Sequence, residues 1–102
     1  MIPTTADETK DQEQPDQTNI KFPDNRLLID LCGEFDKNLA EIEQQLALQI
    51  VRRGNELNLF GDEISRSSGK IVLEALYTRL KNGKSLDTGD LDRELREVTG
   101  GK

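Results

Sequence analysis

From Ile20 onward, the spacing of hydrophobic residues changes from a strand period to a helix period. Ile20 and Phe22 flank a polar residue, which is typical of a short strand, and Pro23 ends it because proline has no N–H for a sheet. The apolar run at residues 26–32 then predicts a short helix that stops at Gly33. A strand remains the alternative for this run, because short apolar segments do not distinguish the two structures.

The middle of the chain predicts a second helix and a β-hairpin. The stretch Gly33-Glu34-Phe35-Asp36 is expected to break the chain between the two helices. The apolar residues of the second helix share one face, at positions i, i+3 and i+7: Leu39, Ile42 and Leu46. Alternating apolar residues then occupy 48–51 and 57–60, on either side of a turn signal at Gly54-Asn55.

The last part of the chain predicts two more helices. The longer one ends at Asn82-Gly83 and carries apolar residues at helical spacing: Ile64, Ile71, Val72, Ala75, Leu76 and Leu80. Gly69 lies inside it at a cost of roughly 1 kcal/mol relative to Ala. This glycine either permits a close approach to the sheet or weakens the helix. The shorter helix places three apolar residues on one face: Leu91, Leu95 and Val98.

Side chains that can accept hydrogen bonds from the first N–H groups of a helix precede each helical segment. The expected caps are Asp24 or Asn25, Asp36 or Asn38, Asp62, and Asp87 or Thr88. Asn38 with Glu41 also resembles a capping box. The element order is therefore β-α-α-β-β-α with one extra helix. We expect an α+β sandwich, a three-stranded antiparallel sheet with helices on one face.

Charge divides the chain into a tail and a domain. The chain carries 20 acidic and 14 basic residues, a net charge of −6. Five of these acids but only one base lie in the first 19 residues, where no large apolar residue follows Ile2. Residues 1–18 are therefore expected to be a disordered acidic tail, or alternatively a lure for a basic partner. We assign residues 19–83 to the domain and 84–102 to the last helix and a linker.

The composition excludes several classes of function. The chain has no His and one Cys, so it cannot form an internal disulfide, a histidine-based catalytic site or the usual zinc-finger ligand set. No run approaches the roughly 18–20 apolar residues of a membrane span, and no signal peptide is visible. We therefore expect a cytoplasmic protein that does not contact a membrane.

The short motifs do not form a catalytic or metal site. Gly83-Lys84-Ser85 matches the end of a P-loop, but Thr78 stands where the leading glycine is required, and the motif follows a helix rather than a strand. The acids from Asp87 to Asp92 lack the spacing of a calcium loop. Cys32 has no histidine partner and is expected in the core. We expect no enzyme, metal or cofactor in this stretch of chain.

A few basic residues mark a candidate contact for nucleic-acid phosphates. Lys37 follows the glycine loop where a helix begins, and backbone N–H groups at such a place can meet a phosphate. Arg52 and Arg53 end the first strand of the hairpin. These bases share one edge if the loop and hairpin lie side by side. Solvated charges at turn ends are the alternative, because the domain lacks the basic excess typical of nucleic-acid-binding proteins.

The same residues resemble a known family. The element order, with a glycine loop between the first two helices, resembles the type I KH domain, which binds single-stranded RNA. A more specific pattern consists of Cys32-Gly33, Phe35-Asp36, Asn38, Arg53-Gly54-Asn55 and the stretch from Val72 to Tyr77. With these residues, positions 19–98 resemble the N-terminal segment of PhoH-like (phosphate starvation-inducible) ATPases.

The resemblance implies a cytoplasmic bacterial ATPase associated with RNA metabolism. Its P-loop domain, which binds ATP and Mg²⁺, would follow residue 102, and this chain would be an N-terminal piece without a cofactor of its own. The partners implied are single-stranded RNA, the ATPase domain itself or a neighbouring subunit, and a ribonuclease.

The loop departs from the usual KH pattern G-x-x-G. Asp36 replaces the second glycine and Glu34 adds another negative charge. Each carboxylate opposes a phosphate by roughly 1 kcal/mol at ~4 Å in a water-like dielectric. We therefore expect weak RNA binding, with these contacts: Gly33, Lys37, Asn38, Arg52 and Arg53.

A second hypothesis is a protein-interaction or oligomerisation module without nucleic-acid binding. The acidic balance and the altered loop favour it. The apolar face of the last helix, Leu91, Leu95 and Val98, would either supply the contact or pack on this domain's own core.

Overall fold

The structure, a computed structural model, describes residues 17–100. Its elements in chain order are β1 (Gln17–Lys21), α2 (Asn25–Cys32), a short 3₁₀ helix η2 (Glu34–Asp36), α3 (Lys37–Leu46), β2 (Gln49–Arg53), β3 (Glu56–Phe60), α4 (Glu63–Lys81) and α5 (Thr88–Val98). The predicted α+β class and the β-α-α-β-β-α order with a further C-terminal helix are confirmed. The apolar run at 26–32 is a helix and not a strand.

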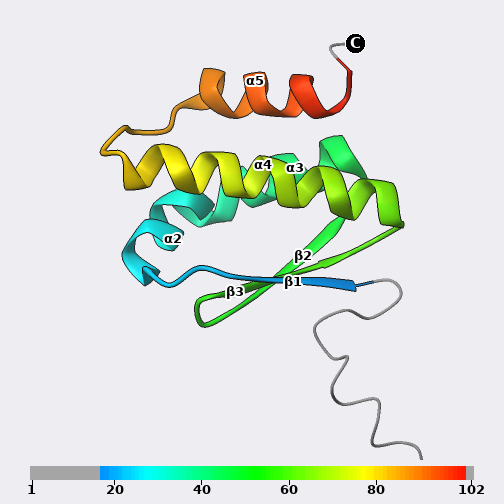
Figure 1. Ribbon diagram of the computed structural model, residues 1–102, viewed down its shortest axis with the longest axis horizontal. Helices are drawn as coiled ribbons and strands as arrows, with labels where there is room; N and C mark the ends of the chain where they lie inside the picture. Colours follow the sequence, from blue (N-terminus) through cyan, green and yellow to red (C-terminus); the bar gives the residue numbers. More distant parts are fainter. Residues whose placement is uncertain (1–16, 101–102) are drawn as a thin grey trace, which may run out of the picture.

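β3 is the central strand of an antiparallel sheet with the order β1-β3-β2. Leu57 of β3 pairs with Ile20 of β1, and Leu59 pairs with Ile50 of β2. Because directly paired residues point to the same side of a sheet, these apolar side chains share one face. The helices lie on one side of the sheet in Figure 1, and no described helix covers the other side.

The core lies between the sheet and the helices, and α5 contributes to it. Leu91 and Leu95 of α5 are buried in the same cluster as the leucines of α2, α3 and β3, and Val98 packs against that cluster. Arg79 of α4 also forms an ion pair with Asp90 of α5 at 3.0 Å. The apolar face of the last helix therefore packs on this domain's own core and is not open to a partner.

Gly69 permits a close approach between α4 and the sheet. A Cβ built at this position would lie 2.5 Å from Leu48 Cδ1 and 3.2 Å from Leu59 Cδ1. Leu59 is fully buried and Leu48 is 7% exposed, so a methyl group here would displace side chains of the core. Of the two interpretations of this glycine, close approach is the one that the structure supports.

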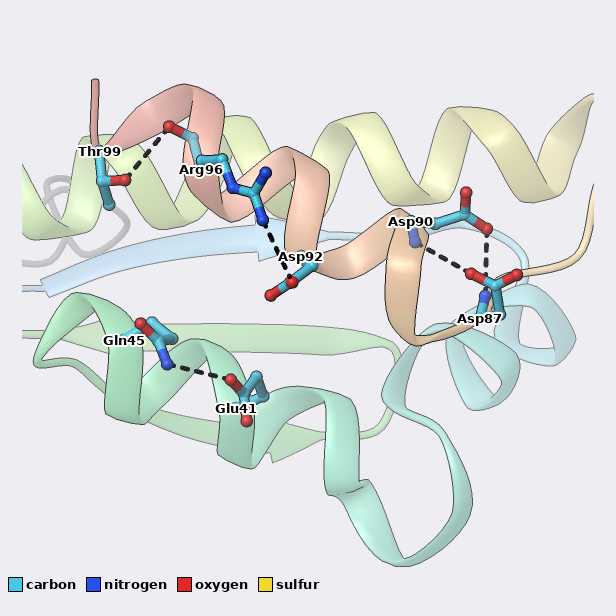
Figure 2. Close-up of polar contacts among 7 residues, drawn as sticks. All are labelled: Glu41, Gln45, Asp87, Asp90, Asp92, Arg96 and Thr99. Atoms are coloured by element: carbon cyan, nitrogen blue, oxygen red, sulfur yellow. Dashed lines mark hydrogen bonds and ion pairs between the residues drawn. The ribbon is translucent and has the colours of Figure 1, made fainter. Parts of the chain in front are cut away.

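Most predicted caps are confirmed. Asp24 accepts hydrogen bonds from the N–H groups of Arg26 and Leu27, and Asp62 accepts one from Ser65. At the start of α5, Asp87 and Asp90 each accept a hydrogen bond from the other's backbone N–H, as Figure 2 shows. This reciprocal pair satisfies donors that the first turn of a helix otherwise leaves without partners.

β1 begins earlier than the hydrophobic pattern predicts. Gln17, Thr18 and Asn19 pair with β3, although none of them is apolar. Backbone pairing with β3, together with polar side-chain contacts to that strand, extends β1 beyond its apolar residues. Gln17 and Thr18 therefore belong to the sheet and not to the predicted tail, whereas the rest of that tail, residues 1–16, lies outside the described residues.

Candidate nucleic-acid interface

Gly33 and Asn38 form the joint between α2 and α3. Gly33 has φ +81°, a conformation that favours glycine, and a Cβ there would lie 2.8 Å from Asn38 Nδ2. That Nδ2 group donates a hydrogen bond of 3.0 Å to the carbonyl oxygen of Leu31 in the last turn of α2. Both candidate residues therefore have a structural role, because Asn38 satisfies a carbonyl that the end of α2 leaves unpaired.

The predicted caps of α3 are wrong. Asp36 has φ 56° and makes no side-chain capping bond, and the Asn38 side chain points back to α2, so the predicted capping box with Glu41 does not form. Phe35 shares this left-handed conformation with Asp36, and the η2 turn thereby leads directly into α3. A capping residue needs an extended backbone just before the helix. The η2 turn gives Asp36 a left-handed backbone instead, so Asp36 does not cap α3.

Lys37 lies in acidic surroundings. Together with Gly33 and Asn38 it lines a hollow of about 340 Å³ whose wall also contains three acids: Asp30, Glu34 and Asp87. A neighbouring hollow adds Glu41 of α3 and Asp92 of α5, which belong to the facing helices of Figure 2. Asp92 also pairs with Arg96 of its own helix at 3.6 Å. The negative charges around Lys37 oppose the approach of a phosphate.

Arg52 lies close to the joint between α2 and α3. Its guanidinium group donates a hydrogen bond of 3.7 Å to Cys32 Sγ. Burial raises the pKa of the Cys32 thiol, and the hydrogen bond and charge of Arg52 oppose this shift in part. Cys32 is 1% exposed, so it is a core residue, as predicted. Arg52 is thus adjacent to Gly33 in space through Cys32.

Arg53 is separated from Arg52 by the sheet. Successive residues of a strand point to opposite faces, so Arg52 faces the helices and Arg53 faces the uncovered side. There Arg53 lines a shallow hollow of about 830 Å³ with Lys21 of β1 and Glu56 of β3. The expectation that both arginines share one edge with Lys37 is therefore wrong, because strand pleating divides the pair.

The uncovered face of the sheet has three rows of side chains, which we call the open face. The strand register places Lys21, Glu56 and Arg53 in the first row; Asn19, Asn58 and Val51 in the second; and Gln17, Phe60 and Gln49 in the third. Neighbouring rows are about 7 Å apart, two residues along each strand. A cationic end, a row of amides and an aromatic ring thus follow one another across the sheet.

Hydrogen bonds fix the side chains of this face. Asn58 Oδ1 accepts hydrogen bonds from Asn19 Nδ2 at 2.7 Å and Gln17 Nε2 at 3.2 Å. Glu56 accepts one from Asn19 Nδ2 at 3.0 Å, and its other oxygen lies 3.8 Å from Lys21 Nζ. Asn58 is only 8% exposed. The amides and the acid are therefore held in place by contacts among themselves.

The open face could not be predicted from the sequence pattern, because its polar residues do not interrupt the alternation of the strands and match no motif. Their only signal is that they are the polar residues of alternating strands, and such residues are ordinarily expected to face solvent. Glu43 of α3 accepts a hydrogen bond from the Ile50 N–H of edge strand β2 at 2.7 Å. This bond occupies a backbone donor that would otherwise be available to another strand.

No protein-family model matches the chain, and no solved structure matches it. Between residues 17 and 100, no helix is long and apolar enough to cross a membrane. Within the same range, no cluster of three or more His, Cys, Asp or Glu side chains is arranged to hold a metal ion.

Proposed function

We propose that this chain is a KH-like, single-stranded RNA-binding module, the N-terminal part of a PhoH-like ATPase of the bacterial cytoplasm. ATP and Mg²⁺ would bind in a P-loop domain that follows residue 102. The described residues would contribute RNA contact and no catalytic step.

The topology is the single observation that carries this proposal. A β1-β3-β2 antiparallel sheet has helices on one face, and a tight glycine turn at Gly33 joins α2 to α3. The type I KH domain, a module that binds single-stranded RNA, has the same element order with a glycine loop at the same place. The left-handed φ of 56° at Asp36 is the conformation that a glycine adopts most easily, at the position where the G-x-x-G pattern has its second glycine.

Binding of single-stranded RNA by the whole chain tests this function. Fluorescence anisotropy of a labelled ten-nucleotide oligouridylate, measured over a range of salt concentrations, should give a dissociation constant that rises with salt. Replacing both Arg52 and Arg53 with Ala should weaken this binding. A dissociation constant above about 1 mM at low salt, weaker than ordinary non-specific binding, would contradict the proposal.

A protein-interaction module is the second candidate, and exposed apolar side chains on α4 favour it. Ile64 is 79% exposed and Ile71 is 57% exposed, and they lie at i and i+7 on the same side of that helix. Phe35, at the turn before α3, is 95% exposed. The binding partner in this alternative would be the ATPase domain, a neighbouring subunit or a ribonuclease.

Sedimentation experiments distinguish this alternative. Association should appear as a concentration-dependent sedimentation coefficient of the chain, or as binding to the separately made ATPase domain. Replacing Ile64 and Ile71 with Ser should abolish either behaviour, while the same change at an exposed position such as Lys70 should not. A monomer at all concentrations that ignores the ATPase domain would remove this candidate.

A further inference from the structure

From the arrangement of charges and amides, we infer that RNA binds to the open face of the sheet and not to the glycine turn between α2 and α3. The inference rests on the proposed function and names the surface that performs it. The ligand is a short segment of single-stranded RNA laid across the strands, with a phosphate at the cationic row and bases over the amide and aromatic rows.

The first argument compares the charges of the two surfaces. In the hollow beside the glycine turn, Lys37 is the only base among lining residues that include Asp30, Glu34 and Asp87. On the open face, Lys21 and Arg53 flank one acid, Glu56. Glu56 is already engaged by Lys21 and by Asn19. A phosphate therefore meets net positive charge at the open face and net negative charge at the turn.

The second argument is the availability of Arg53. Arg52, on the opposite side of β2, bonds to Cys32. Arg53 is exposed and has no hydrogen-bond or ion-pair partner among residues 17–100. A guanidinium group offers several N–H donors in a fixed planar arrangement, which suits a phosphate or the edge of a base. Arg53 is thus the more available of the two arginines.

The third argument is the pair of amides in the second row. Asn19 and Asn58 use one donor and one acceptor in bonding to each other. Asn19 Oδ1 and Asn58 Nδ2 have no partner among the described residues, although Asn58 is 8% exposed. An acceptor and a donor side by side can pair with the edge of an unstacked base. Both residues line the hollow on this face, where these two groups are open to a ligand.

Apolar side chains complete the surface. Val51 lies in the amide row and Phe60 in the next row, and both line the same hollow. The faces of bases stack on aromatic rings independently of sequence. A large contiguous apolar patch would instead favour a protein partner, whereas here the amides separate Phe60 from the cationic row. The combination of cations, amides and one ring favours RNA.

Two single substitutions and two control variants test this inference in the whole chain, with the same labelled oligouridylate. Arg53→Gln, at an exposed position, should raise the dissociation constant about fivefold and reduce the salt slope by about 1. Phe60→Leu retains apolar volume but removes the ring, and should weaken binding at least about fivefold. The matched controls Lys37→Gln and Arg52→Gln should leave the dissociation constant unchanged.

A second measurement does not depend on substitution. In ¹⁵N-labelled protein, RNA should shift the side-chain amide resonances of Asn19 and Asn58 and the backbone resonances of β1 and β3. The backbone resonances of η2 and the first turn of α3 should remain unshifted. This result requires only the native sequence, so a variant that fails to fold does not affect it.

The possible results separate the inference from the function on which it rests. If the native chain binds RNA, but Lys37→Gln or Arg52→Gln weakens binding and Arg53→Gln does not, the inference is overturned and the function stands. Resonance shifts confined to η2 and α3 have the same meaning. If the native chain does not bind RNA at all, both are overturned, and a protein partner becomes the better explanation of this surface.

Discussion

Replacing Gly69 with Ala tests the packing of α4 on the sheet. The built Cβ lies 2.5 Å from Leu48 Cδ1, whereas carbon atoms in contact are most stable at about 3.5–4.0 Å. Leu48 must therefore move by about 1 Å, or α4 must withdraw from the sheet. The second contact, 3.2 Å from Leu59 Cδ1, limits that movement, because Leu59 lies in the central strand and is fully buried.

Two opposing effects set the magnitude of the change. Replacing glycine with alanine inside a helix stabilises the helix by about 1 kcal/mol. Overpacking a well-filled core costs typically about 1–3 kcal/mol. The expected net result is a loss of about 1 kcal/mol in the free energy of unfolding, which lowers the melting temperature of a domain of this size by about 4–8 °C.

Urea unfolding followed by circular dichroism measures this loss. The midpoint should fall while the dependence of the free energy on urea stays constant. Gly89→Ala in α5 is the matched control, since its Cβ would lie 3.4 Å from Asp87 Oδ1, an ordinary contact. We expect that control to be neutral or to stabilise the protein by up to about 1 kcal/mol.

A double-mutant cycle identifies the contact responsible. Leu48→Ala alone should cost about 2–5 kcal/mol, but it removes the atom that the new methyl group meets. In that background, Gly69→Ala should be neutral or stabilising. If Gly69→Ala stabilises the native background as much as Gly89→Ala does, α4 does not need the space, and our explanation of this glycine is wrong.

The remaining predictions concern single side chains. Ala47 ends α3 with φ 57°, so Ala47→Gly should raise the free energy of unfolding in urea by about 1 kcal/mol. Asn38→Ala should lower it by about 1 kcal/mol through loss of the bond to Leu31, and Asn38→Asp should lower it further, because a carboxylate would face a carbonyl. The hydrogen bond from the Ser65 N–H lowers the pKa of Asp62. This bond therefore stabilises the folded state fully above the ordinary pKa of an aspartate, and its contribution is lost as the pH falls below about 4. Asp62→Asn should reduce the change in melting temperature over that range, and an unchanged profile would contradict the assignment. Burial and the raised pKa of Cys32 predict that iodoacetamide labels this thiol only at the rate of unfolding; rapid labelling of the folded protein would contradict the buried position.

The hairpin and the last two helices were predictable because local signals agree there. Gly54-Asn55 marks the hairpin turn, and Asp62 caps α4 while Asn82 ends it. Each signal acts within a few residues of the chain and needs no distant partner. The alternation of Leu57 and Leu59 also indicates which face of β3 is buried, since the period of a strand is two.

The start of β1 and the entry to α3 were not predictable in the same way. Gln17 enters the sheet through Asn58, which lies 41 residues further along the chain. Asn38 bonds to Leu31 of the preceding helix and not to its own helix. In both cases a polar side chain has several possible partners in the sequence, and only the packed chain selects one.

The candidate site shows the same limit. The sequence identified Lys37, Arg52 and Arg53 as bases near turns, but their distribution over two faces depends on how β2 lies in the sheet. The acids around Lys37 come from α2, η2, α3 and α5, so the local charge is a tertiary property. Net charge alone cannot distinguish an acidic hollow from a basic one on the same molecule.

The sequence by itself determined the element order, the hairpin and the buried face of each strand, because periodicity and capping act over short distances. Tertiary structure alone decided which polar side chains meet on the open face. It also decided that α5 closes the core and that Gly69 lies against Leu48. The physical reason is that contacts between distant segments depend on register and packing, and neither is encoded within a single segment.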